Sequence, residues 1–103
     1  MKKKTIFISM PMKDKTEDEI KQQFGRVKKE LTEWGYEVID SIISPDKSNL
    51  GEDCLSDLYY LGESIKKLSY CNYIYFCKGW DKARGCKIEY QAALDYGLEI
   101  IYE

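Results

Sequence analysis

Residues 77–97, with the sequence CKGWDKARGCKIEYQAALDYG, contain the side chains best suited to chemistry. Glu89 follows Cys86 by three residues and precedes Ala93 by four, so the three share one side of an expected helix. A carboxylate on the packed side of a helix is poorly placed for a purely solvating role, and a carboxylate can act as a nucleophile without histidine, which the chain lacks. The alternative is that Glu89, in the first turn of the helix, interacts favourably with the helix dipole, and the spacing alone leaves both interpretations open.

Four residues that precede Glu89 could contribute to a binding site. Gly79 and Gly85 let the backbone turn sharply and approach a ligand, and free amide groups where Gly85 opens a helix favour an anion. Trp80 could stack on a flat ligand ring, and Arg84 could bind a phosphate or a carboxylate. Each of these residues could instead have a structural role. The glycines could serve only a tight turn, Trp80 could cover the end of the sheet, and Arg84 could be an exposed surface charge.

The hydrophobic pattern predicts strands and helices that alternate along the chain. Thr16 and Glu19 form a capping box that begins a helix, and apolar residues then recur at helical spacing until Gly35. Gly97 ends the helix that carries Glu89. The expected strands are residues 5–9, 36–40, 73–77 and 98–102, and the expected helices are residues 16–35, 54–69 and 86–96.

This alternation predicts an α/β fold of the Rossmann or flavodoxin-like kind. We expect a small, doubly wound parallel sheet of about four strands in the order 2-1-3-4, with helices on both faces. In that order the winding direction changes between the first and third strands, and ligands of open sheets bind there, outside the carboxyl ends of the strands. The loops of residues 10–15 and 78–85 should therefore meet at the binding site. The polar connection at residues 41–52 is long enough to be a mobile lid, but its length does not establish one.

Length and composition indicate one domain that spans residues 1–103. The formal net charge is −2, so no overall basic field exists to hold a nucleic-acid polymer. The chain lacks the apolar run of a signal peptide or a membrane helix, and we expect a cytoplasmic protein with no membrane partner.

The four cysteines form no CxxC pair, and we expect neither a metal nor another cofactor. Cys71 and Cys77 should behave as small buried hydrophobic residues. Cys86, at a helix start, could have a lowered thiol pKa, although a packing role is favoured because no general base is evident beside it.

Two segments, IFISMPM at residues 6–12 and YIYFCKGWDKARGCKIEYQAALDYG at residues 73–97, resemble the nucleoside 2-deoxyribosyltransferase-like superfamily, in particular its small bacterial and phage members. The most specific part is the strand, the Gly-Trp turn and the Gly-small-x-x-Glu pattern before an Ala-rich helix. The resemblance covers nearly the whole chain and implies that Glu89 is the nucleophile that attacks the anomeric carbon of the sugar and displaces the base. It also implies that residues 9–12 line the pocket and that homo-oligomers are usual.

The implied reaction is cleavage or transfer at the N-glycosidic bond of a (deoxy)nucleoside or its 5′-monophosphate. A carboxylate can trap the oxocarbenium-like state covalently, and water or a second base then accepts the sugar. Asp14, Asp40 and Asp81 are candidates for the acid that protonates the base, and Asp81 ranks first because its loop leads to Glu89. The expected catalytic residues are Glu89 and Asp81, and the expected nucleoside-binding or nucleotide-binding residues are Ser9, Met10, Pro11, Met12, Gly79, Trp80, Arg84, Gly85 and Cys86.

Three residues depart from the family pattern. Ala83 stands where an acidic residue is common, Met10 replaces a frequent glycine and would narrow the approach to a ligand, and Phe7 replaces a frequent tyrosine. Ala83 and Met10 favour a second interpretation, a nucleotide-binding module that has kept the pocket and lost the chemistry. A third interpretation is an interaction protein with an oligomer interface built by Tyr59, Tyr60, Tyr70 and Tyr90.

Overall fold

The structure of the protein is a computed structural model that describes residues 4–39 and 56–103. Within these ranges the strands and helices alternate along the chain, as the sequence predicts. The predicted connection at residues 41–52, together with Asp40 and Cys54, lies outside the described residues. Among the helices of the described ranges, none is long and apolar enough to cross a membrane.

The strands form one parallel sheet in the order β2-β1-β3-β4, which confirms the predicted order. β1 and β3 lie at its centre and are paired so that Ser9 lies opposite Phe76, where both strands end. The carboxyl ends of β1 and β3 therefore meet at one edge of the sheet. The bounds of the strands are Thr5–Ser9 for β1, Glu37–Val38 for β2, Tyr73–Phe76 for β3 and Glu99–Tyr102 for β4.

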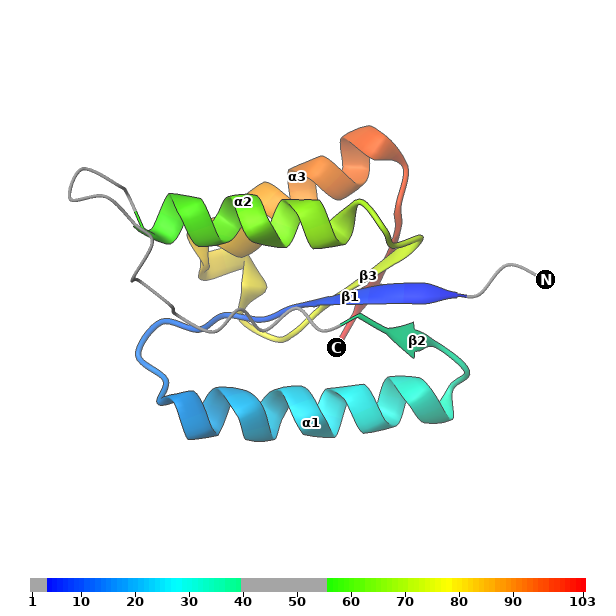
Figure 1. Cartoon of the computed structure of the whole chain (residues 1–103), viewed down its shortest axis with the longest axis horizontal. Coiled ribbons are helices and arrows are strands. Elements are labelled where there is room, and N and C mark those ends of the chain that lie inside the picture. The colour runs from blue at the N-terminus through cyan, green and yellow to red at the C-terminus, as the bar shows by residue number, and fades with distance from the viewer. Residues whose placement is uncertain (1–3, 40–55) are drawn as a thin grey trace.

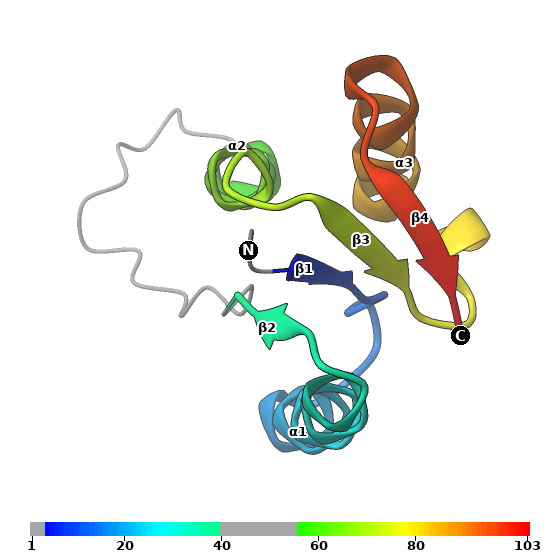
Figure 2. The same ribbon diagram turned by 90° about the vertical axis from the view of Figure 1, so that its right-hand side faces the viewer.

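Helices cover both faces of this sheet. Figures 1 and 2 show α1 on one face, and α2 and α3 side by side on the other. This arrangement is the predicted doubly wound α/β architecture, in which each apolar face of the sheet is buried by helices. The bounds of the helices are Glu17–Glu33 for α1, Ser56–Leu68 for α2 and Arg84–Tyr96 for α3, and a short 3-10 helix, η1, spans Trp80–Lys82.

α1 begins with the capping box that the sequence predicts. The backbone N–H of Glu19 donates to Oγ1 of Thr16 at 3.1 Å, and the backbone N–H of Thr16 donates to Oε1 of Glu19 at 3.4 Å. These bonds satisfy two amide groups that a helix start otherwise leaves unpaired. The helix buries Phe24, Val27 and Leu31 against the sheet.

Successive residues of β1 point to opposite faces of the sheet, and this alternation divides the core into two clusters. Ile6, Ile8 and Met10 lie in the cluster on the α1 side. Phe7 lies in the cluster that contains Leu68 at the end of α2 and Ala93 of α3. Ser9, two residues after Phe7, therefore faces α2 and α3.

The helix that carries Glu89 begins earlier than predicted. α3 starts at Arg84 rather than at Cys86, and its N-cap is Ala83, whose side chain makes no capping bond. The predicted loop before it contains η1, which follows a left-handed Gly79. Three strands are shorter than predicted: β2 has two residues, β3 ends at Phe76 and β4 begins at Glu99.

Candidate functional site

A buried hydrogen bond joins the end of β1 to α3 and forms the centre of the candidate site. Oγ of Ser9 donates to Oε1 of Glu89 at 2.8 Å. Ser9 is 1% exposed and Glu89 is 6% exposed. Apart from Tyr75 and the cysteines, they are the only residues with polar or charged side chains among the buried residues of the described ranges. The two residues are 80 positions apart in the sequence, so the fold brings them together.

Burial controls the ionisation of Glu89. Loss of hydration raises the pKa of its carboxyl to about 7, while the hydrogen bond from Ser9 favours the charged form and lowers the pKa. A carboxyl group with a pKa near neutrality can exchange a proton or act as a nucleophile at neutral pH. Perturbed carboxyls of this kind, next to a specific partner, are typical of functional sites.

The helix-dipole interpretation of Glu89 is weakened by where α3 begins. With Arg84 as the first helical residue, Glu89 lies in the second turn, and the first turn contains no acidic residue. The dipole interaction decreases within the first turn, so it does not account for a buried carboxylate at this position. The prediction that Cys86, Glu89 and Ala93 share one side of α3 is confirmed, because these three are the buried residues of the helix.

The less favoured alternative for Cys86, a lowered thiol pKa, is contradicted. The pKa of its thiol is raised to about 11, mainly by burial; the Ser9 hydroxyl opposes this rise and the negative charge of Glu89 adds to it. Cys86 is 4% exposed, and burial outweighs any effect of the helix start. Its packing role is therefore favoured. Cys71 and Cys77 are also buried, as predicted.

The two loops predicted to meet at the carboxyl edge do meet. A Cβ atom placed on Gly79 would lie 3.7 Å from Cγ of Pro11, so the loop after β3 contacts the loop after β1. Gly79 has φ +92°, a left-handed backbone conformation that residues other than glycine rarely adopt. On the far side of the site, a Cβ on Gly85 would lie 3.9 Å from Cδ1 of Leu61, which places the start of α3 against α2.

Trp80 covers the end of the sheet. Its ring lies 4.6 Å from the ring of Tyr90, with an interplanar angle of 24°, and 4.9 Å from the ring of Phe76 at the end of β3. Of the two predicted roles, the cover over the sheet end is the one that the structure shows. Stacking on Tyr90 occupies one face of the indole.

The remaining predicted site residues are more scattered. Met10 packs into the core on the α1 side, so it lies on the other face of the sheet from Glu89 and does not narrow an approach to it. Met12 is 43% exposed. Asp81 is exposed on η1, and within the described residues no hydrogen bond or ion pair joins it to Glu89. Arg84 is exposed at the first position of α3.

The sequence predicts Ser9 as a pocket residue but does not connect it with Glu89. Strand alternation contains the signal, because Phe7 is a core residue facing α2 and α3 and Ser9 shares its face. Lys15, the last residue of the predicted loop 10–15, donates from Nζ to Oε1 of Gln23 in α1 at 2.7 Å.

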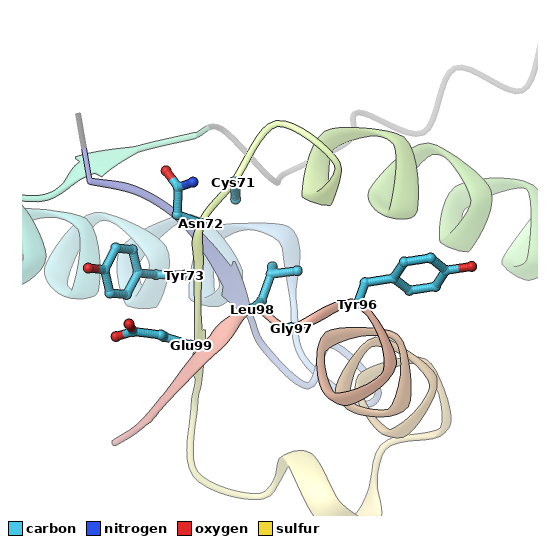
Figure 3. Close-up of a pocket in the computed structure, with 7 residues that line it drawn as sticks. All are labelled: Cys71, Asn72, Tyr73, Tyr96, Gly97, Leu98 and Glu99. Atoms are coloured by element: carbon cyan, nitrogen blue, oxygen red, sulfur yellow. The ribbon is translucent and has the colours of Figure 1, made fainter. Parts of the chain in front are cut away.

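Two surface hollows lie elsewhere. One, of about 310 Å³, is at the opposite edge of the sheet, where β3 and β4 begin; Figure 3 shows Tyr73 and Glu99 there, with the ring of Tyr96 extending away from them. The other, of about 390 Å³, runs beside the first turns of α1 and is lined by Lys15, Glu19, Gln22, Gln23 and Arg26. Neither includes Glu89. Among the described residues, no cluster of three or more cysteine or acidic side chains could hold a metal ion.

Comparison with known proteins identifies the family. The chain belongs to the family described as Domain of unknown function (DUF4406), whose model matches residues 4–102. No curated protein and no solved structure matches the chain. The match spans both loops and both residues of the Ser9–Glu89 pair, so the candidate site lies within the family domain.

Proposed function

We propose that this DUF4406 domain cleaves or transfers the N-glycosidic bond of a (deoxy)nucleoside or a nucleoside 5′-monophosphate, with Glu89 as the nucleophile. The observation that carries the proposal is the buried Glu89 carboxyl, held by Ser9 at the carboxyl edge of β1. The resemblance to the nucleoside 2-deoxyribosyltransferase-like superfamily supplies the substrate class. The enzyme is accordingly a nucleoside deoxyribosyltransferase or a deoxynucleoside N-glycosidase.

The first step forms a covalent intermediate. A carboxylate oxygen of Glu89 donates an electron pair to the anomeric carbon and forms a glycosyl ester. The bond from that carbon to the base nitrogen breaks, the electron pair stays on the base, and the base takes up a proton. Asp81 is the proposed donor of this proton, although its position on η1 requires that the substrate bridge the distance to Glu89.

The second step releases Glu89. Water attacks the anomeric carbon and loses a proton to the deprotonated acid, and the electrons of the ester bond return to the Glu89 carboxylate. Free sugar is then the product. If a second base takes the place of water, its ring nitrogen forms the new bond, its N–H proton passes to the deprotonated acid, and the product is an exchanged nucleoside.

Two features support the proposed roles of Glu89 and of the start of α3. A pKa of about 7 leaves a substantial fraction of Glu89 ionised at neutral pH, and an ionised carboxylate is the form that attacks. The first turn of α3, which contains Gly85, is where a 5′-phosphate would bind, because amide groups at the start of a helix favour an anion. We also propose a homo-oligomer, on the resemblance alone.

A binding module without catalysis is the second candidate. Ala83 occupies the N-cap of α3 in an extended conformation and provides no acidic group there. Glu89 is also only 6% exposed, which limits the approach of a sugar. Such a module would bind a nucleotide and leave the base attached.

Chromatography of reaction mixtures tests the proposal. Purified protein is incubated with deoxynucleosides and their 5′-monophosphates, with and without an acceptor base, and the release or exchange of base is measured. Wild type should release or exchange base, and Glu89→Gln should lose this activity by a factor on the order of 10³ or more. Glu99→Gln, which changes an exposed glutamate at the start of β4, should remain active.

An unchanged rate in Glu89→Gln would overturn the assignment of Glu89 as nucleophile. Saturable binding of a nucleotide by wild type, with no base released from any member of the panel, would replace the enzyme with the binding module.

A further inference from the structure

The sequence predicts that Ser9 contacts the substrate, but its hydroxyl proton is already donated to Glu89. We infer that Ser9 is a positioning residue, which holds Oε1 of Glu89 and thereby leaves Oε2 as the oxygen presented to the anomeric carbon. This inference rests on the proposed role of Glu89 and adds a specific function for its partner.

The position of the Ser9 hydroxyl is determined by the rigid centre of the sheet. The backbone carbonyl of Ser9 accepts a hydrogen bond from the N–H of Cys77 at 2.9 Å, so the β1–β3 ladder continues through this residue. Ser9 lies opposite Phe76, which is fully buried. A group placed on a central strand is held more precisely than one on a loop, and precise placement of the attacking atom is a large part of catalysis.

The Glu89 side of the pair is equally fixed. Cys86 and Ala93, one turn before and one turn after Glu89, are buried with it and hold this side of α3 against the sheet. The hydrogen bond therefore joins two elements that the core already fixes. It sets the rotation of the carboxyl group rather than the position of the helix.

The single proton of the Ser9 hydroxyl is already used, so Ser9 could contact a substrate only as a hydrogen-bond acceptor. A serine hydroxyl has one proton to donate, and here it is donated to Oε1 at 2.8 Å. Within the described residues, no hydrogen bond is recorded to Oε2. One oxygen is thus constrained by the protein, and the other retains its lone pairs for the reaction.

The same bond influences protonation. Burial raises the pKa of Glu89, and the donated hydrogen bond opposes this rise by favouring the carboxylate. Within residues 4–39 and 56–103, burial and Ser9 are the causes of the shift, and the neighbouring Cys86 thiol, with its pKa raised to about 11, stays neutral at neutral pH. Loss of the hydroxyl should therefore raise the pKa of Glu89 and leave less of the attacking form at neutral pH.

The test is a titration of the Glu89 side-chain carboxyl by 13C NMR, with its signal identified by its loss in Glu89→Gln. Ser9→Ala should move the midpoint upward by about one pH unit, because hydrogen bonds to charged groups are worth more than that shift requires. Ser9→Thr, which retains a hydroxyl, should restore most of the wild-type midpoint. Ser64→Ala, which removes a half-buried hydroxyl from α2, should leave it unchanged.

A second measurement needs no variant of Ser9. In wild type, the hydroxyl proton of Ser9 should exchange slowly with water and show a nuclear Overhauser effect to the side-chain protons of Glu89. An unshifted midpoint in folded Ser9→Ala, or a rapidly exchanging Ser9 hydroxyl in wild type, would overturn the inference.

These outcomes are independent of turnover. If the titration shifts as expected but wild type releases no base, the positioning interaction stands and the proposed reaction fails. If base is released, Ser9→Ala should displace the acidic limb of the pH–rate profile to higher pH, parallel to the NMR midpoint.

Discussion

Glu89 is a carboxyl group whose environment disfavours its charge. The side chain is buried, and the single hydrogen bond from Ser9 compensates only part of the lost hydration, so the pKa is raised from 4.5 to about 7. Natural cores usually exclude such groups unless they are paired or have a function. The residue is consequently both a cost to folding at neutral pH and the main candidate for chemistry.

The folding cost predicts a distinctive pH dependence of stability. Because the pKa of Glu89 is higher in the folded chain than in the unfolded chain, the folded state binds this proton more tightly. The associated stability is fully present below pH 4.5 and is lost as the pH rises through about 7. Between pH 4 and pH 8, the free energy of unfolding of wild type should fall by roughly 3 kcal/mol more than that of Glu89→Gln.

Urea unfolding at a series of pH values measures this difference. Glu99→Gln, at an exposed position, should follow the wild-type curve. Parallel curves for wild type and Glu89→Gln would show that Glu89 titrates normally and would remove the physical basis of the site.

At the scale of elements, the sequence predicts some helix boundaries and not others. The start of α1 was predictable because Thr16 and Glu19 form a capping box with a recognisable spacing. The start of α3 was not, because Ala83 caps it without a side-chain bond and therefore leaves no residue signal. η1 was missed for a similar reason, since three residues are too few to show a period.

Gly79 lies where the two loops of the site meet, and its replacement should lower the stability of the fold. It has φ +92°, and the residue lies close to Pro11. Gly79→Ala should lower the free energy of unfolding by about 1–2 kcal/mol, because a side chain is disfavoured in the left-handed region. Gly25→Ala is the matched control. Gly25 is exposed in α1 with nothing within 4 Å of an added Cβ, so the change should stabilise the protein by roughly 0.5–1 kcal/mol.

Thermal and denaturant unfolding of the two variants give the comparison. Equal effects of both substitutions would show that the left-handed turn at Gly79 is not a requirement of the fold.

At the scale of the whole molecule, the topology was the most predictable feature. Strands alternate with helices, parallel strands need crossover connections, and right-handed crossovers leave few possible orders. The edge at which the loops meet was predictable for the same reason. Which side chains face each other across that edge was harder. The side of the sheet to which Met10 turns was missed, although alternation from Ile6 and Ile8 contains the information.

The Ser9–Glu89 pair shows why the site was only partly predictable. Its members are 80 residues apart, and their contact depends on the register of β1 with β3 and on the rotation of α3 about its axis. Periodicity predicts the buried side of each element separately. It does not predict that the two polar residues on those sides coincide, which is a property of the packed molecule.

The most direct test of Glu89 as the nucleophile is to look for the glycosyl ester on its side chain. The protein is incubated with 2′-deoxy-2′-fluoro nucleosides and their 5′-monophosphates, since an electronegative fluorine destabilises the oxocarbenium-like state and slows release of the intermediate. Intact-mass spectrometry, followed by peptide mapping, then measures any adduct. If Glu89 is the nucleophile, the mass should increase by the sugar without its base, with the adduct located on Glu89 and absent from Glu89→Gln. Base release without an adduct on Glu89, or an adduct that persists in Glu89→Gln, would contradict it.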